Sequence, residues 1–486
     1  MPKRVAVIDI GSNSVRLVVY ERTSRFAFHL LNESKSKVRL SENAYQNSGN
    51  LSEIAMSRTI DVLRDFLSII SSYKARKTLC IATSALRDAP NKKEFLQRAK
   101  KELKLNIKII DGQKEAYLGA IACANLLPAQ QESLTIDIGG GSTEFALINN
   151  KDISNTISLN LGTIRIKELF CDDRKKDEAI EYIDEKLSVL DGLNASALVG
   201  IGGTFRALSS AILTRKKHPL NKLHAFSYSA KELYDYLSQV MDATKNELKK
   251  LGIKADRFDI IRPGALILQR VLKKLSIKDI VTSGVGVREG AFLADLLRNS
   301  KDRFPEHYSI STRYILDSHI SEKAIASQLS FLVKKIFDLT HKHLAIDKSY
   351  RRDLSIAAKL YPCGNSIHFY SKNKHSYYIL QSALEYGFTH KQITLISTLC
   401  KYAKKKLPSS SHIQKYKELL PEKNTLDALS FILSLSVSLV AHRPRNLKYN
   451  FVFEDGILNI NADETLHLSR ESFNKLDTIE NLKVIF

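Results

Sequence analysis

The stretch Val5-Ala-Val-Ile-Asp9-Ile-Gly11-Ser-Asn13-Ser14-Val15-Arg16-Leu-Val-Val-Tyr20 decides the fold. A β-branched run meets an acid, then a turn of small polar residues, then a second apolar run, and this pattern predicts a β-hairpin. The pattern returns at Leu134-Thr-Ile-Asp137-Ile-Gly139-Gly140-Gly141-Ser142-Thr143-Glu144-Phe-Ala-Leu-Ile148. The chain therefore contains two matching hairpins.

Each hairpin opens a longer unit in which strands alternate with amphipathic helices. The first unit is expected to continue with a helix over 51–73, a strand over 77–82, a helix over 91–103 and a strand over 107–110. The second is expected to continue with a helix over 175–190, a strand over 197–201, a helix over 205–213 and a strand over 279–282. A duplicated α/β unit of this length predicts two similar domains around a cleft.

The pattern changes after about residue 305. Apolar residues between 311 and 442 have helical spacing, and strand signals are scarce there. The last stretch, 447–486, resembles a hairpin, a helix and a final strand. We therefore expect α/β domains over 1–124 and 125–304, a helical domain over 305–442 and a small α/β cap over 443–486.

Composition narrows the class of protein. The 486 residues are 44% hydrophobic, which argues against wholesale disorder, and the net charge of +22 suits a polyanionic partner. Five scattered cysteines without C-x-x-C spacing argue against a disulfide framework or structural zinc and fit a reducing cytoplasm. The N-terminus meets Asp9 too early for a signal peptide, and the longest apolar stretch, 428–441, is too short to span a bilayer. We expect a cytoplasmic protein with a buried helix there.

The turns carry the first hint of chemistry. Consecutive small residues after a strand let backbone N–H groups converge on an anion, as in phosphate-binding loops. Asp9 and Asp137 end the strands that lead into these turns, where a carboxylate can hold Mg²⁺ beside phosphate oxygens. One such turn is weak evidence, but the pairs Gly202-Gly203 and Gly284-Val-Gly286 repeat the feature. Phosphate binding is favoured over ordinary turns.

Six motifs extend this interpretation. They are, in chain order, Ile8-Asp9-Ile-Gly11-Ser-Asn13-Ser14-Val-Arg16, Ala82-Thr-Ser-Ala-Leu-Arg87-Asp88, Ile110-Asp-Gly-Gln-Lys-Glu115, Ile136-Asp137-Ile-Gly-Gly-Gly-Ser142-Thr143-Glu144, Gly200-Ile-Gly-Gly203-Thr204 and Ser283-Gly-Val-Gly286-Val-Arg288-Glu289-Gly290. Together they resemble the exopolyphosphatase/guanosine pentaphosphate phosphatase (Ppx/GppA) family. The resemblance implies two duplicated domains of the actin, sugar-kinase and Hsp70 superfamily, which are ribonuclease H-like.

The resemblance also implies roles for individual residues. Glu115 matches the carboxylate that activates the attacking water, and Asp9, Asp137 and Glu144 match the acidic cluster around Mg²⁺. Mn²⁺ is an alternative metal, and a need for K⁺ stays open. Arg16, Arg87 and Arg262 match substrate contacts, although Pro263 makes the surroundings of Arg262 atypical. The matching phosphate-binding residues are Gly11, Ser12, Asn13, Ser14, Gly139, Gly140, Gly141, Ser142, Thr143, Gly203 and Thr204.

The helical region resembles the HD-phosphohydrolase-like third domain of long family members. A metal-binding HD site needs a His-Asp pair, but Leu360-Tyr361 stands in its place, and Ala403 replaces a further histidine. His375 alone makes no metal site, so the domain is interpreted as a degenerate HD domain. Its lysines are expected either to line a path for a polyanion or to form a solvated face; they are Lys372, Lys374, Lys401, Lys404, Lys405 and Lys406.

Several functions remain open at this point. The resemblance implies hydrolysis of inorganic polyphosphate, removal of the 5′-terminal phosphate of guanosine pentaphosphate to give the tetraphosphate, or both. The alternatives are a non-catalytic sensor of such ligands, against which Glu115 argues, and an ATP-using enzyme of the wider superfamily. No DNA or membrane partner is expected, and the sequence leaves open whether the protein forms a homodimer.

Overall fold

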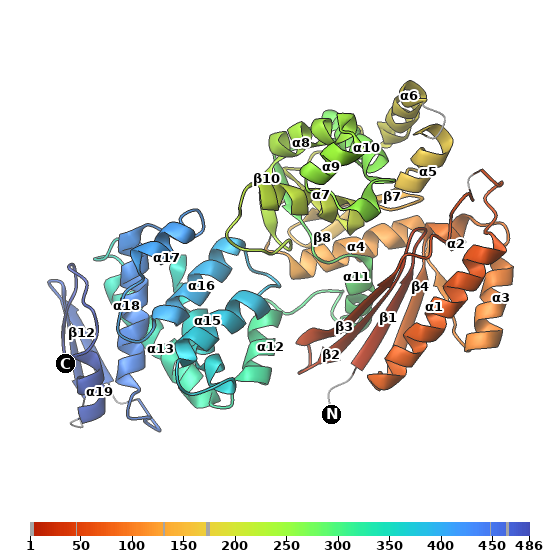
Figure 1. Cartoon of the computed structure of the whole chain (residues 1–486). Helices are drawn as coiled ribbons and strands as arrows, with labels where there is room; N and C mark the ends of the chain where they lie inside the picture. Colours follow the sequence, from red (N-terminus) through yellow and green to blue (C-terminus); the bar gives the residue numbers. More distant parts are fainter. Residues whose placement is uncertain (1–3, 45, 130–131, 172–174, 448, 463–465) are drawn as a thin grey trace. The chain divides into compact units, whose positions relative to one another are not determined.

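The computed structural model describes residues 4–44, 46–129, 132–171, 175–447, 449–462 and 466–486 (Figure 1). The chain forms two compact units, Met1–Tyr308 and Ser309–Phe486. This division lies close to the change in pattern near residue 305. The finer boundaries stay predictions, and the one at 124/125 falls inside a continuous helix, α4 (Gly112–Leu126).

The first half of the N-terminal unit is a five-stranded sheet in the order β3-β2-β1-β4-β5. Strand β1 is antiparallel to β2 and parallel to β4. Helices α1 and α3 pack on the sheet through residues such as Leu63 and Phe95, which share a core with Ile8. The strands are β1 (Arg4–Ile10), β2 (Val15–Arg22), β3 (Phe28–Ser36), β4 (Lys77–Ala82) and β5 (Lys108–Ile109). The helices are α1 (Glu53–Ser72), α2 (Ser84–Asp88) and α3 (Lys92–Leu103).

The second half repeats this topology. Its sheet has the order β10-β11-β9-β6-β7-β8, so β8-β7-β6-β9-β11 corresponds to β3-β2-β1-β4-β5. The strands are β6 (Glu132–Ile138), β7 (Thr143–Asn149), β8 (Asp152–Leu159), β9 (Ala197–Ile201), β10 (Phe226–Ser229) and β11 (Asp279–Thr282). The helices, besides α4, are α5 (Thr163–Ile166), α6 (Lys176–Leu187), α7 (Gly202–Arg215), α8 (Ala230–Asp242), α9 (Lys245–Lys250), α10 (Ile261–Lys274) and α11 (Val287–Leu296). The predicted pair of similar α/β domains is confirmed.

The two hairpins match residue by residue. Asp9 pairs with Arg16 across the first hairpin, and Asp137 pairs with Glu144 at the same position of the second. In each turn a glycine N–H donates to a serine carbonyl three residues later, Gly11 to Ser14 (3.2 Å) and Gly139 to Ser142 (2.9 Å). The hairpin prediction is confirmed, and each sheet adds a third antiparallel strand, β3 or β8, that the sequence pattern did not indicate.

The C-terminal unit is helical with a small sheet, as expected. Its helices are α12 (Ile310–His319), α13 (Lys323–Thr340), α14 (Tyr350–Leu360), α15 (Lys372–Ala383), α16 (His390–Tyr402), α17 (Ser410–Lys415), α18 (Lys423–Leu439) and α19 (His467–Phe473). The strands β12 (Tyr449–Glu454), β13 (Ile457–Ala462) and β14 (Lys483–Ile485) form one sheet. The apolar stretch after residue 428 is the buried helix α18.

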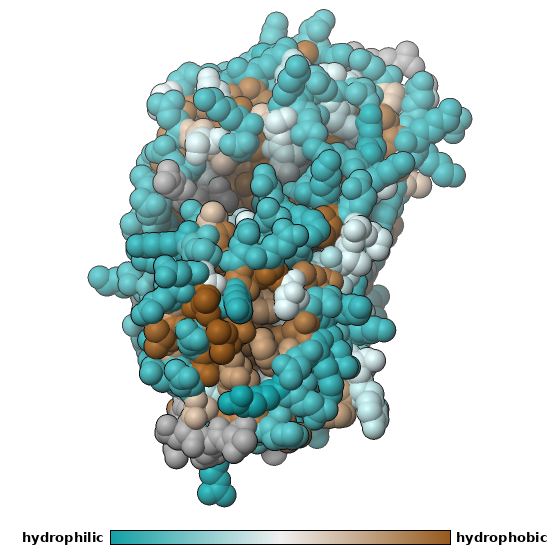
Figure 2. Space-filling view, turned by 90° about the vertical axis from the view of Figure 1, so that its left-hand side faces the viewer, coloured by the Kyte–Doolittle hydropathy of each residue, from teal (hydrophilic) through white to brown (hydrophobic). Residues whose placement is uncertain are grey.

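The surface of this unit is mixed in character. Figure 2 faces it and shows hydrophobic residues gathered within a mainly hydrophilic surface. Its exposed hydrophobic side chains include Ile367, Phe369, Tyr370, Tyr378 and Leu468. Within the described part of the chain, no helix has the length and apolar character needed to cross a membrane.

Candidate active site

A cavity of about 140 Å³ is lined by residues of both halves of the N-terminal unit. Both glycine-rich turns reach it, together with the start of α7 and the segment before α11. Of the residues expected to bind phosphate, metal or substrate, those that line it are Asp9, Gly11, Ser12, Asn13, Ser14, Arg16, Glu115, Asp137, Gly139, Gly140, Ser142, Gly203 and Thr204. The duplicated fold thus brings together residues that lie far apart in the sequence.

The two turns approach each other closely. A Cβ atom added to Gly140 would lie 2.8 Å from the Cβ of Ser12, so only glycine leaves room for this approach. Ser12 in turn lies within hydrogen-bond distance of Ser84, with 3.0 Å between their hydroxyl oxygens. In the described residues, no backbone acceptor pairs with the N–H groups of Ser12 and Asn13, nor with that of Gly140. Such N–H groups are suited to binding phosphate oxygens.

Two carboxylates line the cavity where the first strand of each half ends. Burial raises the pKa of Asp9, and burial raises the pKa of Asp137 to about 6. The negative charge of Asp9 also raises the pKa of Asp137, whereas Arg206 lowers it. Two partly buried acids that repel each other are stabilised by a cation between or near them.

Glu144 differs from these two acids. It is buried, does not line the cavity, and accepts a hydrogen bond from Ser158 (3.0 Å) on the neighbouring strand. Burial raises its pKa to about 8. Among the described residues no three His, Cys, Asp or Glu side chains are close enough to share one ion. The donor set still fits Mg²⁺, which commonly uses one or two carboxylates and completes its shell with water and phosphate oxygens. Asp9 and Asp137 would be those carboxylates.

Glu115 lies in the first turn of α4. That turn is fixed by Asp111, whose side chain accepts a hydrogen bond from the N–H of Lys114 (2.6 Å). Burial raises the pKa of Glu115 well above its usual value, and the charge of Glu144 raises it further. A carboxylate with a raised pKa is a better proton acceptor once it is ionised, which suits a general base.

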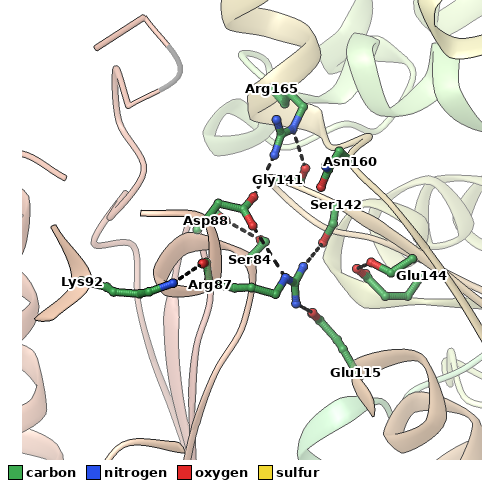
Figure 3. A network of polar contacts seen from close by, with 12 residues as sticks. Ser84, Arg87, Asp88, Lys92, Glu115, Gly141, Ser142, Glu144, Asn160 and Arg165 are labelled. Atoms are coloured by element: carbon green, nitrogen blue, oxygen red, sulfur yellow. Dashed lines mark hydrogen bonds and ion pairs between the residues drawn. The ribbon is translucent and has the colours of Figure 1, made fainter. Parts of the chain in front are cut away.

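Arg87 holds Glu115 from the opposite half of the unit (Figure 3). Its Nη1 donates to Glu115 Oε2 at 3.0 Å, and its Nη2 donates to Ser142 Oγ at 3.3 Å. Arg87 does not line the cavity, so it lies behind Glu115. Its charge lowers the pKa of Glu115, against the effect of burial.

A second ion pair joins the two halves beside Arg87. Arg165 of α5 donates to Asp88 of α2 at 2.9 Å and to the carbonyl of Gly141 at 2.9 Å (Figure 3). Gly141 therefore acts through its carbonyl here and does not line the cavity. The helix α2 thus contacts the second glycine turn from the other half.

A group of basic side chains faces the turns. The described lining includes five of them, of which only Arg16 was expected; the others are Lys35, Arg206, Arg257 and Arg288. Burial and the nearby charges of Arg288 and Arg206 lower the pKa of Arg16 to about 10. Burial, Arg16 and Arg257 lower the pKa of Lys35 to about 8. These cations repel one another, and a polyanion would relieve that repulsion.

Two of these residues had a signal in the sequence. Arg288 belongs to the quoted motif at 283–290, and Arg206 follows Gly202-Gly203 by one turn of α7. Gly202 itself has φ +79°, and a Cβ atom there would lie 2.1 Å from Asp137 Oδ1. Lys35 and Arg257 come from β3 and from the turn before α10, and no motif marks them.

Two expected residues point elsewhere. Arg262 does not line the cavity; its guanidinium donates to the carbonyl of Ala243. It lies in the first turn of α10, and Arg257, before that helix, reaches the cavity in its stead. Thr143 is fully buried and its hydroxyl donates to the carbonyl of Leu161, so it supports the turn from behind.

Two family descriptions match the chain. The Ppx/GppA phosphatase family matches residues 18–299, and domain III of Ppx/GppA phosphatases matches residues 308–477. A curated relative, the bifunctional 3-dehydroquinate synthase/phosphatase of Fusobacterium nucleatum subsp. nucleatum, is 33% identical over 310 residues, or 59% of this chain. The match spans 46% of that relative, about half its length.

Solved structures agree with these matches. The Aquifex aeolicus member of the Ppx/GppA family is 26% identical with a TM-score of 0.54, and the match covers 62% of this chain and 99% of that one. An exopolyphosphatase from Cytophaga hutchinsonii is 27% identical with a TM-score of 0.57, covering 62% of this chain and 100% of that one. Because the family pattern extends over more than half of its residues, the chain belongs to the Ppx/GppA phosphatase family.

Proposed function

We propose that the protein hydrolyses the terminal phosphoanhydride bond of inorganic polyphosphate and releases orthophosphate, with Mg²⁺ as its cofactor. The observation that carries the proposal is the position of Glu115, a partly buried carboxylate at a cavity that both glycine-rich turns line. The similarity of fold to the Cytophaga hutchinsonii exopolyphosphatase supports the same reaction class.

Glu115 would act as the general base. It accepts a proton from a water molecule, whose oxygen attacks the terminal phosphorus in line with the bridging oxygen. The new P–O bond forms as the bridging P–O bond breaks. Orthophosphate leaves with the oxygen of the water, and the shortened chain keeps the bridging oxygen with its electron pair.

Arg87 would couple this step to substrate binding. In the structure its guanidinium donates hydrogen bonds to both Glu115 and Ser142, so the Glu115 carboxylate is ion-paired. A terminal phosphate beside the Ser142 turn competes for the same guanidinium, since arginine binds phosphate oxygens in a bidentate manner. Loss of the ion pair would raise the basicity of Glu115 when substrate is present.

The negative charge of the phosphate groups would be balanced by the N–H groups of the turns and by the basic side chains. The N–H groups of Ser12 and Gly140 would bind oxygens of the terminal phosphate, and Arg16 and Arg288 would bind the charge that develops in the transition state. Mg²⁺, held by Asp9 and Asp137, would supply a Lewis acid that neutralises phosphate oxygens.

The lining favours a bare phosphate chain over a nucleotide. The described lining contains no aromatic residue, and its volume of about 140 Å³ is below the usual range for drug-sized ligands, roughly 300–1,000 Å³. Guanosine pentaphosphate is the second candidate, because its 5′-triphosphate presents the same terminal phosphate while its base lies outside.

Phosphate release from polyphosphate, guanosine pentaphosphate and ATP, measured side by side with Mg²⁺, tests the proposal. Release from polyphosphate at the highest kcat/KM supports it, and preference for guanosine pentaphosphate selects the second candidate. Tight binding of polyphosphate or guanosine pentaphosphate without phosphate release from any of the three compounds would indicate a sensor. Phosphate release from ATP alone would indicate an ATP-using enzyme.

A further inference from the structure

The C-terminal unit has a cavity of its own, larger than the cleft of the N-terminal unit. Its volume is about 460 Å³, within the range of small-molecule sites. It is formed by α13, α18, the segment that leads into α15, and residues after α16. Leu329, Val437 and Val440 give it an apolar wall.

Aromatic side chains stand at this cavity. Tyr361 is buried in its wall, whereas Phe369 and Tyr370 are 63% and 75% exposed. The ring centroids of Phe369 and Tyr370 lie 5.7 Å apart at a steep angle. Exposed aromatic rings beside a cavity are suited to stacking on a planar base.

Basic side chains line the same cavity as the aromatic residues. The Lys372 ammonium lies 5.4 Å from the centre of the Tyr361 ring and 5.6 Å from that of Phe369. Burial lowers the pKa of Lys372, and the charges of Arg443 and Lys404 lower it further. Arg443 is paired with Glu322, but within the described residues Lys372, Lys404 and Lys405 form no ion pair. These three lysines are available to an anionic ligand.

The start of α15 adds hydrogen-bond donors on the same side. Ser371, Lys372 and Asn373 line the cavity. Ser371 precedes the helix with φ 58°, and its side chain does not cap the first turn. The free N–H groups of a first helical turn favour a phosphate group. This feature supports the site, which rests on the cavity, the aromatic residues and the lysines.

The lining argues for binding without hydrolysis. Glu322 is its one acidic residue within the described lining, and the ion pair with Arg443 occupies it. Tyr361 stands where an HD domain would have a metal ligand, and no metal-binding group of acids and histidines is found in the described residues. Neither a free general base nor a metal site is present there.

We propose that this cavity binds a purine nucleotide with two or more phosphates. Tyr370 stacks on the base, Phe369 packs against the edge of the base, and Lys372, Lys404 and Lys405 bind the phosphates. A bare polyphosphate would use the lysines alone and leave the apolar wall and both aromatic rings without a role. The site is separate from the cleft and does not depend on what the cleft hydrolyses.

Photolabelling of the full-length protein with 8-azido-ATP tests this proposal. After proteolysis, label on peptides that contain Phe369, Tyr370 or Lys404 is measured against probe concentration, which gives an apparent Kd for this cavity alone. Tyr370→Ala should weaken that Kd by about 5- to 150-fold, the range for loss of one base-stacking residue. Lys404→Glu should weaken it by about tenfold or more, because it removes a charged contact to phosphate.

Matched variants separate this site from a general surface effect. Tyr378→Ala removes a tyrosine of α15 that is also exposed (68%) but does not line the cavity. Lys406→Glu changes an exposed lysine next to Lys405 that does not line the cavity either. Both should leave the apparent Kd within twofold. Label found solely in the N-terminal unit, or equal weakening by Tyr378→Ala, would overturn the proposal. Unlabelled ATP should compete better than AMP or tripolyphosphate, and competition by tripolyphosphate equal to that by ATP would also overturn it.

Discussion

The two cavities of the molecule differ in chemistry as well as in size. The described lining of the cleft holds five basic and three acidic side chains and no aromatic ring. The described lining of the C-terminal cavity holds four basic side chains, one acidic side chain and three aromatic rings. Acids that repel each other beside phosphate-binding turns suit bond breaking, whereas rings and lysines suit recognition. Under the two proposals above, catalysis belongs to the N-terminal unit and nucleotide binding to the C-terminal unit.

The duplicated hairpin explains why the acids gather in one place. The strand that leads into each turn has an aspartate as its next-to-last residue, and Gly140 closely approaches Ser12, so the two turns face each other. The C-terminal cavity has no such symmetry. Its lining comes from several helices and from the segments between them.

Glu115→Gln should have the largest effect on turnover, and it should affect the cleft without affecting the C-terminal cavity. The change deletes the proton acceptor while keeping the shape of the side chain, so kcat should fall about 10²- to 10⁴-fold. Nucleotide labelling of the C-terminal cavity should not change. Steady-state phosphate release from polyphosphate measures kcat. Labelling with 8-azido-ATP measures nucleotide binding by the C-terminal cavity.

Glu94→Gln is the matched control for this variant, because Glu94 also lies in the first turn of a helix but is exposed. It should leave kcat unchanged. Turnover by Glu115→Gln close to that of the parent chain would remove Glu115 from the mechanism.

Arg87→Ala should lower kcat/KM by about 10- to 100-fold, as expected for loss of a charged hydrogen bond. It should also change the pH profile. Because Arg87 lowers the pKa of Glu115 and a base must be ionised to act, the acidic limb should move to higher pH in this variant. Glu144→Gln should move the limb to lower pH, since the charge of Glu144 raises the pKa of Glu115.

The measurement is kcat/KM between pH 5 and 10 at saturating Mg²⁺. Asp65→Asn, a change at an exposed position on α1, serves as the control and should leave the profile in place. A shift of both variants in the same direction would contradict the proposed arrangement of charges around Glu115.

The sequence predicted that a cleft exists better than it predicted which residues line it. The two hairpins with their paired turns followed from local patterns, and the family motifs pointed to Asp9, Asp137 and Glu115, which line the cavity. Arg257 and Lys35 were missed because their position depends on how a loop and an edge strand approach the turns in three dimensions. Arg262 was expected at the substrate, yet the course of the chain into α10 directs it to Ala243. The C-terminal cavity was missed for the same reason, since its lining comes from several separate segments.

Asp9→Asn and Asp137→Asn should each raise the Mg²⁺ concentration for half-maximal activity by about tenfold, because each removes one anionic oxygen that a hard cation prefers. The C-terminal cavity has no metal role in the proposal, so Lys404→Glu should leave the Mg²⁺ dependence unchanged. Titration of phosphate release with MgCl₂ measures this. An unchanged half-saturation in both aspartate variants would contradict the assignment of these acids to the metal.

Removal of the C-terminal unit tests whether the cleft is active without it. The expected effect on the hydrolysis of short substrates is the smallest of the effects predicted above. A fragment of residues 1–308 should keep its kcat/KM for guanosine pentaphosphate within about threefold, because the described cavity is lined from within this unit. Its affinity for long polyphosphate should fall more, by about tenfold, since a long chain can reach lysines outside the cleft, such as Lys401 and Lys406. Added salt should reduce that difference, because exposed charges are screened over about 8–10 Å at physiological ionic strength.

This experiment requires the fragment of residues 1–308 to be folded. Circular dichroism and the retained activity on guanosine pentaphosphate establish that residues 1–308 are folded; the solved relatives, matched over 99% and 100% of their length by 62% of this chain, make that outcome expected. In a folded fragment, a loss confined to long polyphosphate assigns the lysines of the C-terminal unit to the polyanion. Equal losses on both substrates contradict that role, and the C-terminal unit would then act in dimerisation or as a scaffold. A fragment that keeps full affinity for long chains would leave nucleotide binding as the function of the C-terminal unit and make the contrast between the two cavities complete.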